Sequence, residues 1–201
     1  MLNLRPAVGR VVGPLAARLL RLGVTPDMVT VAGVLGAVAG ALALVARGHF
    51  FWGGLVVTVS VLTDALDGTM ARLRGPAGSW GAFLDSTLDR IADASIFCAL
   101  AIWYAGRGDS TVLLAVSLFC LVAGAVTSYA KARAEGLGMT CNVGLAERTE
   151  RLILILLGIL LAGVGLDVAL AIALWLLAAA SAITVAQRLV EVHRQAVLPA
   201  A

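Results

Sequence analysis

Long runs of hydrophobic residues dominate the chain, and these runs predict its secondary structure. We count six that approach or exceed the roughly 20 residues a helix needs to cross a bilayer. They cover residues 28–46, 50–73, 81–105, 110–134, 147–165 and 168–190. Backbone groups in lipid must be hydrogen-bonded within the chain, which favours helices, and the alternating segments of a membrane β-barrel are not seen. The sequence therefore predicts an all-α integral membrane protein with six transmembrane helices.

A different pattern precedes the first crossing. Residues 1–24 contain four arginines among apolar residues that recur at about helical spacing. These arginines are Arg5, Arg10, Arg18 and Arg21. Such a segment predicts an amphipathic helix lying on the membrane surface, because four arginines disfavour a crossing. A helix-start signal follows at residues 25–27, so we expect a transmembrane domain over residues 25–195 and a tail over residues 196–201.

Composition and charge support a membrane protein with a defined orientation. Of the 201 residues, 61% are hydrophobic and 13% are charged, whereas a soluble domain has about 45–50% apolar and about 25% charged residues. With the N-terminus inside, only Arg47 and Arg107 fall on the side away from the other basic residues. The positive-inside rule then places both termini in the cytoplasm and the protein in the cell membrane. The net charge of +3 is small, and no nucleic-acid partner is expected.

Four aspartates lie near the cytoplasmic ends of the second and third crossings. Asp64 and Asp67 are three residues apart, and Asp85 and Asp89 are four apart, so each pair shares one helix face. Each ionised group at membrane depth costs about 2.5–3.5 kcal/mol, so the four carboxylates need a compensating cation. Hard oxygen ligands suit Mg²⁺ or Mn²⁺, and four carboxylates could hold two ions. Asp93 extends the row and is interpreted as a supporting, structural residue.

Three other interpretations of the aspartates are weighed. They could be ordinary helix-end acids paired with Arg72, Arg74 and Arg90, although the insertion cost of four carboxylates disfavours this. Intramembrane acids can also mark an ion pathway, as in a divalent-cation transporter. A transporter would need acids or broken helices that reach both faces, whereas these acids cluster toward one side. A non-enzymatic lipid-binding scaffold would keep its function in Asp85→Asn.

The spacing resembles the signature of the CDP-alcohol phosphotransferase family. The signature reads Asp64-x₂-Asp67-Gly68-x₂-Ala71-Arg72-x₈-Gly81-x₃-Asp85-x₃-Asp89, and all eight fixed positions match. The six helices and the amphipathic start are also similar, so the likeness spans most of the chain. The resemblance implies an enzyme that moves a phosphatidyl group from CDP-diacylglycerol to a small polar alcohol.

The resemblance also implies roles for individual residues. Asp64, Asp67 and Asp85 would ligate metal, as two ions of Mg²⁺ or Mn²⁺. Asp89 would take the proton from the acceptor hydroxyl and contact metal as well. Contacts to the CDP-lipid are implied for Asp27, Met28, Val29, Thr30, Gly68, Ala71, Arg72, Gly78 and Ser79. Enzymes of the family commonly form homodimers, which Gly- and Ala-rich helices allow.

Basic residues on the same side indicate an acceptor that already carries phosphate. Lys131 lies near the end of the fourth crossing, and Arg151 lies near the start of the fifth. Together they would form a cationic pocket suited to a phosphate group. The alternative is that each is a positive-inside anchor or a contact for phospholipid headgroups.

Two segments around these residues resemble the actinobacterial phosphatidylinositol phosphate synthases of the same family. They are Ser-Tyr-x-Lys-Ala-Arg-Ala-Glu from residue 128 and Glu-Arg-x-Glu-Arg-Leu from residue 147. The resemblance implies inositol 1-phosphate as acceptor. It surrounds the acceptor phosphate with Ser128, Lys131, Arg133, Arg151 and Arg188. Phosphatidylglycerophosphate synthases use glycerol 3-phosphate, which is also phosphorylated, so a cationic pocket does not separate the two activities.

Overall fold

The computed structural model describes residues 5–74 and 78–197, with side chains from residue 12 onward, and this part of the chain contains helices and no strand. The elements are α1 (Arg5–Arg21), α2 (Pro26–Ala43), the short 3₁₀ helix η1 (Val45–Arg47), α3 (Phe50–Arg74), α4 (Ser79–Ala105), α5 (Thr111–Gly136), α6 (Arg148–Gly163) and α7 (Asp167–Val197). The all-α class is confirmed, and a helix lies at each of the six predicted runs. The side chains of Arg5 and Arg10, and residues 198–201 of the predicted tail, lie outside the described residues.

Four of the described helices are long and apolar enough to cross a membrane, judged by length and composition. They are α2 continued through η1, α3, α5 and α7. Helix α4 does not qualify because it carries the charged residues Asp85, Asp89, Arg90 and Asp93. Helix α6 does not qualify because it has only 16 residues. The chain is therefore an all-helical protein with at least four candidate spans.

The start of α2 follows from a short cap. Thr25 is the N-cap, and its side-chain oxygen accepts a hydrogen bond from the backbone N–H of Met28 at 3.2 Å. Pro26 occupies the first helical position, where its missing N–H costs nothing, and Asp27 places a negative charge at the positive end of the helix dipole. The helix-start signal in the sequence is confirmed, and it fixes the segment that leads to the aspartates.

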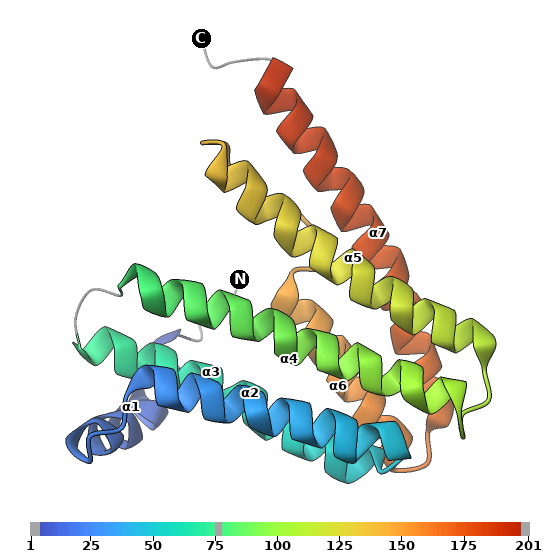
Figure 1. Ribbon diagram of the computed structural model, residues 1–201, viewed down its shortest axis with the longest axis horizontal. Coiled ribbons are helices and arrows are strands. Elements are labelled where there is room, and N and C mark those ends of the chain that lie inside the picture. The colour runs from blue at the N-terminus through green and yellow to red at the C-terminus, as the bar shows by residue number, and fades with distance from the viewer. Residues whose placement is uncertain (1–4, 75–77, 198–201) are drawn as a thin grey trace.

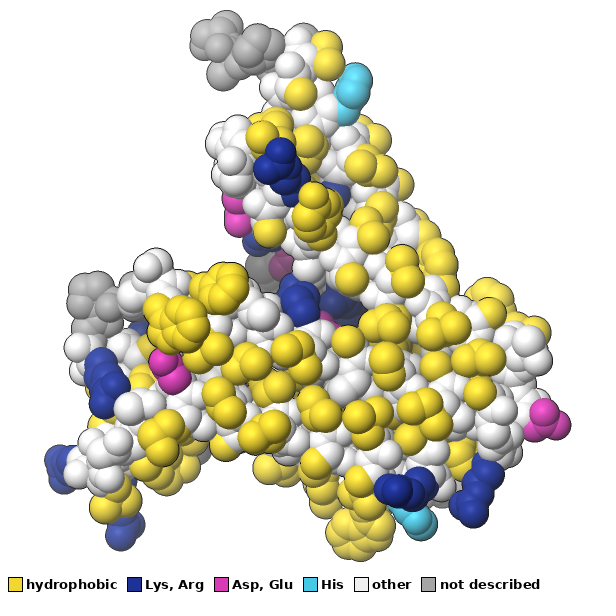
Figure 2. All heavy atoms as spheres, in the orientation of Figure 1, with side chains coloured by type: hydrophobic (Ala, Val, Ile, Leu, Met, Phe, Trp, Pro, Cys, Tyr) yellow, Lys and Arg dark blue, Asp and Glu magenta, His cyan; other side chains and the backbone are white. Residues whose placement is uncertain are grey.

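The helices pack in two groups, as Figure 1 shows. Helix α2 packs against both α3 and α4, while α1 lies against α3 and α6 bridges α3 and α7. Helices α5 and α7 pack together and run away from the other helices toward their C-terminal ends. The core between the groups is apolar and includes the fully buried residues Ile96, Leu100, Ile155 and Leu174. The surface is hollowed between α4 and the α5–α7 arm, with basic and acidic side chains at the bottom (Figure 2).

Glycines bring α2 close to α3 on the way to the aspartates. A Cβ added at Gly36 would lie 2.6 Å from the Ser60 Oγ, and one added at Gly40 would lie 2.8 Å from a methyl carbon of Val56. Gly33, one turn before Gly36, meets α3 in the same way. Small residues allow two helix backbones to approach closely, as is common inside membranes. This seam sets the distance between Thr30 on α2 and the aspartates on α3.

Helix α7 fixes the loop that leads into α6. The Thr184 hydroxyl oxygen accepts hydrogen bonds from the backbone N–H groups of Leu145 at 3.1 Å and Ala146 at 2.9 Å. The Nε of Arg188 donates to the Val143 carbonyl at 2.9 Å. These bonds satisfy backbone groups that would otherwise be stranded in a loop. They hold the first turn of α6 in place, and that turn supplies two arginines to the site.

Candidate active site

Three aspartates from two helices converge near the ends of α3 and α4. Asp64, Asp67 and Asp85 each offer a carboxylate oxygen, and these oxygens lie within 4.8 Å of one another. The three-residue spacing on α3 places the first two side chains on one face, as the sequence predicted. Asp67 is buried, with 5% of its surface exposed. The arrangement concentrates negative charge at one point, where a hard divalent cation would fit.

The arginines of the site balance the charge of this group only in part, through the 3.5 Å contact of Arg148 with Asp64. Among the described residues, neither Asp67 nor Asp85 has a basic side chain within 4.0 Å. Of the three arginines in the helix-end interpretation, only Arg90 contacts an aspartate in the described part of the chain, and it lies 3.7 Å from Asp89. Buried charges are normally paired or bound to metal. The carboxylate oxygens therefore suit Mg²⁺ or Mn²⁺, and ordinary helix-end pairing does not account for them.

Thr30 connects α2 to the metal-site candidates. Its hydroxyl lies 2.5 Å from the Asp67 Oδ2, and it can donate its proton to that carboxylate. The Pro26 carbonyl, 3.1 Å away, is the alternative acceptor. A hydroxyl donor leaves the carboxylate charged and fixes its rotamer. Thr30 was predicted on the nucleotide side, and the structure places it directly against an aspartate.

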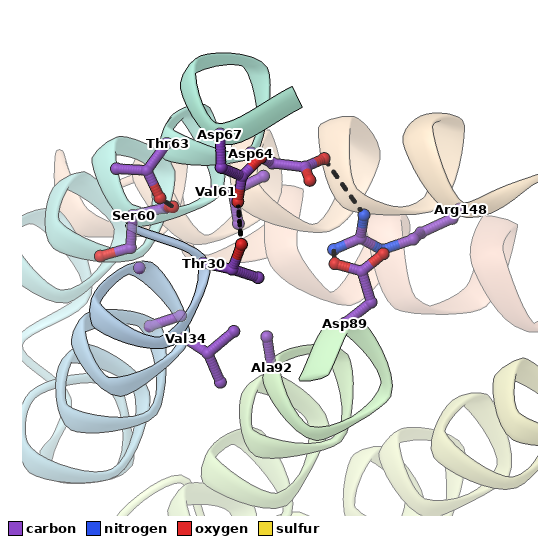
Figure 3. A pocket seen from close by; sticks show the side chains of 12 residues that line it. Thr30, Val34, Ser60, Val61, Thr63, Asp64, Asp67, Asp89, Ala92 and Arg148 are labelled. Atoms are coloured by element: carbon purple, nitrogen blue, oxygen red, sulfur yellow. Dashed lines mark hydrogen bonds and ion pairs between the residues drawn. The ribbon is translucent and has the colours of Figure 1, made fainter. Parts of the chain in front are cut away.

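Asp64, Asp67 and Asp89 line a small cleft, drawn in Figure 3. Polar groups of Thr30, Asp64, Asp67, Asp89 and Arg148 line it. The remaining lining comes mainly from small and apolar side chains of α2, α3 and α4, among them Val34, Ala37, Val61 and Ala92. Low-dielectric walls strengthen electrostatic interactions between the charged groups. The cleft is therefore suited to binding cations and anionic groups together.

Arg148 is the main basic partner of this cluster. Its Nη2 lies 2.6 Å from the Asp89 Oδ1, and its Nη1 lies 3.5 Å from the Asp64 Oδ2 (Figure 3). Its Nε lies 3.4 Å from the Asp93 Oδ1. The planar guanidinium presents its donors in a fixed fork, so one side chain can join three carboxylates. Arg148 was placed on the cytoplasmic side by the sequence, but it was not predicted as a site residue.

Asp93 joins the aspartate cluster to a second arginine. Its Oδ2 lies 3.1 Å from the Arg151 Nη2, while its other oxygen faces Arg148. Asp93 and Arg151 are 7% and 4% exposed. Arg151 also reaches the Gly124 carbonyl at 3.4 Å, and a Cβ at Gly124 would lie only 3.3 Å from its guanidinium carbon. Asp93 was predicted to be a supporting residue, and in the structure it contacts two arginines of α6.

The other residues predicted to contact the CDP-lipid lie around the cluster. Arg72 donates from Nη2 to the Thr69 hydroxyl at 2.9 Å, on the same helix. At Gly68 an added Cβ would meet only the Arg72 Nη1, at 3.5 Å, so the backbone is open to a ligand there. The rest differ in exposure. Met28, Gly78 and Ser79 are exposed, while Asp27, Val29 and Ala71 are partly buried.

The residues predicted around the acceptor phosphate fall into two sets. Arg151 and Arg188 are buried, and Arg188 donates from Nη1 to the Thr127 carbonyl at 2.5 Å. The other three lie on α5. Ser128 donates to the Gly124 carbonyl at 3.1 Å, the Lys131 ammonium lies 4.0 Å from Glu135 on its own helix, and Arg133 is exposed. Arg151 and Arg188 therefore reach α5 from α6 and α7, whereas the contacts of Ser128 and Lys131 stay within α5.

Similarity to known proteins agrees with this geometry. Residues 23–197 match the CDP-alcohol phosphatidyltransferase family. The phosphatidylinositol phosphate synthase of Streptomyces avermitilis is 52% identical over 193 residues, which cover 92% of this chain and 79% of the relative.

Two solved structures are similar along most of their length. Phosphatidylinositol phosphate synthase of Mycobacterium tuberculosis with CDP-DAG bound superposes with a TM-score of 0.88 at 46% identity, covering 91% of this chain and 94% of that one. The same enzyme in complex with manganese and citrate gives a TM-score of 0.87 at 46% identity, covering 90% and 88%. The manganese complex agrees with the divalent-metal cofactor expected here. With a matching signature, fold and relatives, the chain belongs to the CDP-alcohol phosphatidyltransferase family.

Proposed function

We propose that the chain transfers the phosphatidyl group of CDP-diacylglycerol to inositol 1-phosphate, giving phosphatidylinositol phosphate and CMP. The observation that carries this proposal is the convergence of Asp64, Asp67 and Asp85 within 4.8 Å, with Asp89 in the cleft that Asp64 and Asp67 line. These are four of the eight signature positions of the family. The names of the similar synthases support the choice of acceptor.

In this proposal Asp64, Asp67 and Asp85 hold the divalent metal, and Asp89 adds a further carboxylate. Bound metal neutralises pyrophosphate charge and stabilises the leaving CMP, as in other phosphoryl transfers. Thr30 keeps the Asp67 carboxylate oriented through its 2.5 Å contact. Gly68, Ala71 and Arg72 receive the CDP group, together with the predicted segment at residues 27–30 and with Gly78 and Ser79.

The reaction itself then requires one proton transfer and one bond exchange. Asp89 accepts the proton of the inositol hydroxyl. The hydroxyl oxygen attacks the phosphorus that carries diacylglycerol, and the bond from that phosphorus to the CMP oxygen breaks. Arg151 supplies positive charge for the acceptor phosphate with Lys131, Arg133, Ser128 and Arg188. Most of the rate gain comes from holding these groups in line.

The acceptor assay tests the reaction directly. Purified protein in detergent is supplied with CDP-diacylglycerol, Mg²⁺ or Mn²⁺ and, separately, inositol 1-phosphate, free inositol, glycerol 3-phosphate or serine. We expect CMP and a lipid product with inositol 1-phosphate alone. Arg151→Ala should weaken this turnover through a higher acceptor KM, while Arg47→Ala, at the opposite end of the helices, should leave it unchanged. Turnover with glycerol 3-phosphate would refute inositol 1-phosphate as the acceptor. A folded, metal-loaded protein that releases no CMP with any acceptor would refute the transferase activity.

We further propose six crossings in the cell membrane, with both termini and the active site on the cytoplasmic side. Helix α6 is short, about 24 Å long at 1.5 Å per residue, but its arginine end is paired inside the protein through Asp93. Asp89 and Asp93 of α4 are paired in the same network, which lowers the cost of placing both helices in lipid. A homodimer is proposed as well, and cross-linking in native membranes tests it.

The orientation predicts which engineered cysteines face outward. In a background without Cys98, Cys120 and Cys141, Arg107→Cys should react with a membrane-impermeant maleimide on intact spheroplasts. Leu137→Cys, in the loop before α6, should react only after lysis. Both positions are exposed, so accessibility within the protein does not limit either reaction. The reverse labelling pattern would contradict the proposed topology.

A further inference from the structure

The guanidinium of Arg148 contacts two of the carboxylates that the family signature assigns to metal. Its two terminal nitrogens face Asp89 at 2.6 Å and Asp64 at 3.5 Å. Arg148 comes from α6, whereas the signature lies on α3 and α4, so this contact is independent of the motif. The arginine side chain is 22% exposed and lines the cleft itself. The Arg148 guanidinium therefore contacts carboxylates that would also bind the metal.

We propose that Arg148 is a positioning residue that competes with divalent metal for the negative charge of Asp64 and Asp89. This inference rests on the metal site of the proposed function. Two cations that share the same carboxylates repel each other, so binding of one weakens the binding of the other. Arg148 therefore lowers the metal affinity of the free enzyme while it keeps the carboxylates of α3 and α4 together.

Asp93 explains how Arg148 can yield to metal without leaving the site. The Arg148 Nε lies 3.4 Å from Asp93, which is buried and lies one turn beyond Asp89 on α4. The contact to Asp93 uses a different nitrogen from the contacts to Asp64 and Asp89. The guanidinium can thus give up the latter two and remain anchored by the former. Metal loading then replaces the arginine contacts of Asp64 and Asp89 with metal contacts, while Arg148 stays on Asp93.

The test is Mn²⁺ affinity in the absence of substrates, measured by electron paramagnetic resonance on purified protein in detergent. Arg148→Met should bind Mn²⁺ about tenfold more tightly than the wild type, a coupling of ordinary size. After treatment with chelator the same variant should melt at a lower temperature than the wild type. Saturating Mn²⁺ should also raise the melting temperature of this variant more than that of the wild type, because tighter binding to the folded state stabilises it more.

Two matched variants separate competition from a general charge effect. Arg90→Met removes an arginine 3.7 Å from Asp89 that contacts no other aspartate among the described residues, and it should tighten Mn²⁺ binding less. Arg148→Lys keeps the charge but has a single ammonium in place of the fork, so its affinity should fall between wild type and Arg148→Met. If Arg148→Met fails to fold, the Mn²⁺ affinity of Arg148→Lys is compared with that of the wild type instead.

The outcomes distinguish this inference from the proposed function. Equal or weaker Mn²⁺ binding by folded Arg148→Met would overturn the competition, while the wild-type metal site would stand. Wild-type protein that binds no Mn²⁺, or binding that survives Asp67→Asn unchanged, would instead refute the metal site. Without a metal site, the proposed competition between Arg148 and metal would be refuted as well.

Discussion

Asp85→Asn should lower CMP release by about 10²–10³-fold, the scale of losing an electrostatic group that acts on developing charge. The substitution is isosteric and removes one full negative charge from the three carboxylates within 4.8 Å. Asp85 is the clearest position for this change because no basic side chain lies within 4.0 Å of it among the described residues. No arginine is therefore left without its partner, and the loss reports on metal binding. The measurement is kcat at saturating substrates across a Mn²⁺ titration.

The same substitution should not destabilise the protein. Three carboxylates held together repel one another, so removing one charge relieves repulsion when metal is absent. In chelator, Asp85→Asn should melt at or above the wild-type temperature, and added Mn²⁺ should raise its melting temperature less. Asp109→Asn, an exposed acid beyond the end of α4, is the control and should behave as wild type in both assays. Full turnover by Asp85→Asn would contradict the role of Asp85 as a metal ligand.

The helices could be predicted closely because lipid leaves the backbone few alternatives. Each apolar run of about 20 residues became a helix, and ends set by a local signal, such as Thr25 before α2, were found within a few residues. The last helix was predicted to end near residue 190 but continues to Val197. Beyond residue 190 the pattern turns polar, and pairs one helical turn apart, such as Glu191 with Arg194 at 2.9 Å, support the helix instead.

The site could be predicted where its residues share a helix or lie on two helices joined by a short loop, as Asp85 does with Asp64 and Asp67. Asp64 and Asp67 were paired correctly from their spacing, because a helical face is a local property. The arginine partners of the aspartates were not predicted, because Arg148 lies 84 positions beyond Asp64 and 55 beyond Asp93 in the sequence. Such contacts depend on how α6 is placed by its loop and by α7. The extension of the aspartate row to Asp93 was the one signal in the sequence that pointed toward this network.

Asp93→Asn should be the most destabilising single change in the site. Asp93 is the only acid within 4.0 Å of Arg151 among the described residues, and both side chains are almost fully buried. Removing one partner of a buried ion pair costs about 3–5 kcal/mol because the other charge is left uncompensated. For a chain of this size such a loss lowers the melting temperature by about 10 °C. Thermal unfolding in detergent, with Mn²⁺ present throughout, measures it.

A double-mutant cycle separates the contribution of the Asp93–Arg151 ion pair from the effect of each substitution alone. Asp93→Leu with Arg151→Met replaces both charges by apolar groups, and exchanging a buried pair in this way is often neutral. The double variant should therefore melt closer to the wild type than Asp93→Leu or Arg151→Met alone, which gives a coupling between the two sites. Glu150→Gln, an exposed acid beside Arg151 on α6, is the matched control. Equal melting temperatures for Asp93→Asn and this control would contradict the pairing.

Kinetics show whether Asp93 positions the acceptor arginine as well as stabilising the fold. Asp93 fixes the guanidinium of Arg151, so its loss should raise the KM for inositol 1-phosphate more than the KM for CDP-diacylglycerol. Its other oxygen holds Arg148, so the Mn²⁺ dependence should shift in the same variant. A purely structural residue would lower the amount of folded enzyme and leave both constants unchanged. A change in acceptor KM at equal folded concentration therefore identifies Asp93 as the residue that links the metal cluster to the phosphate pocket.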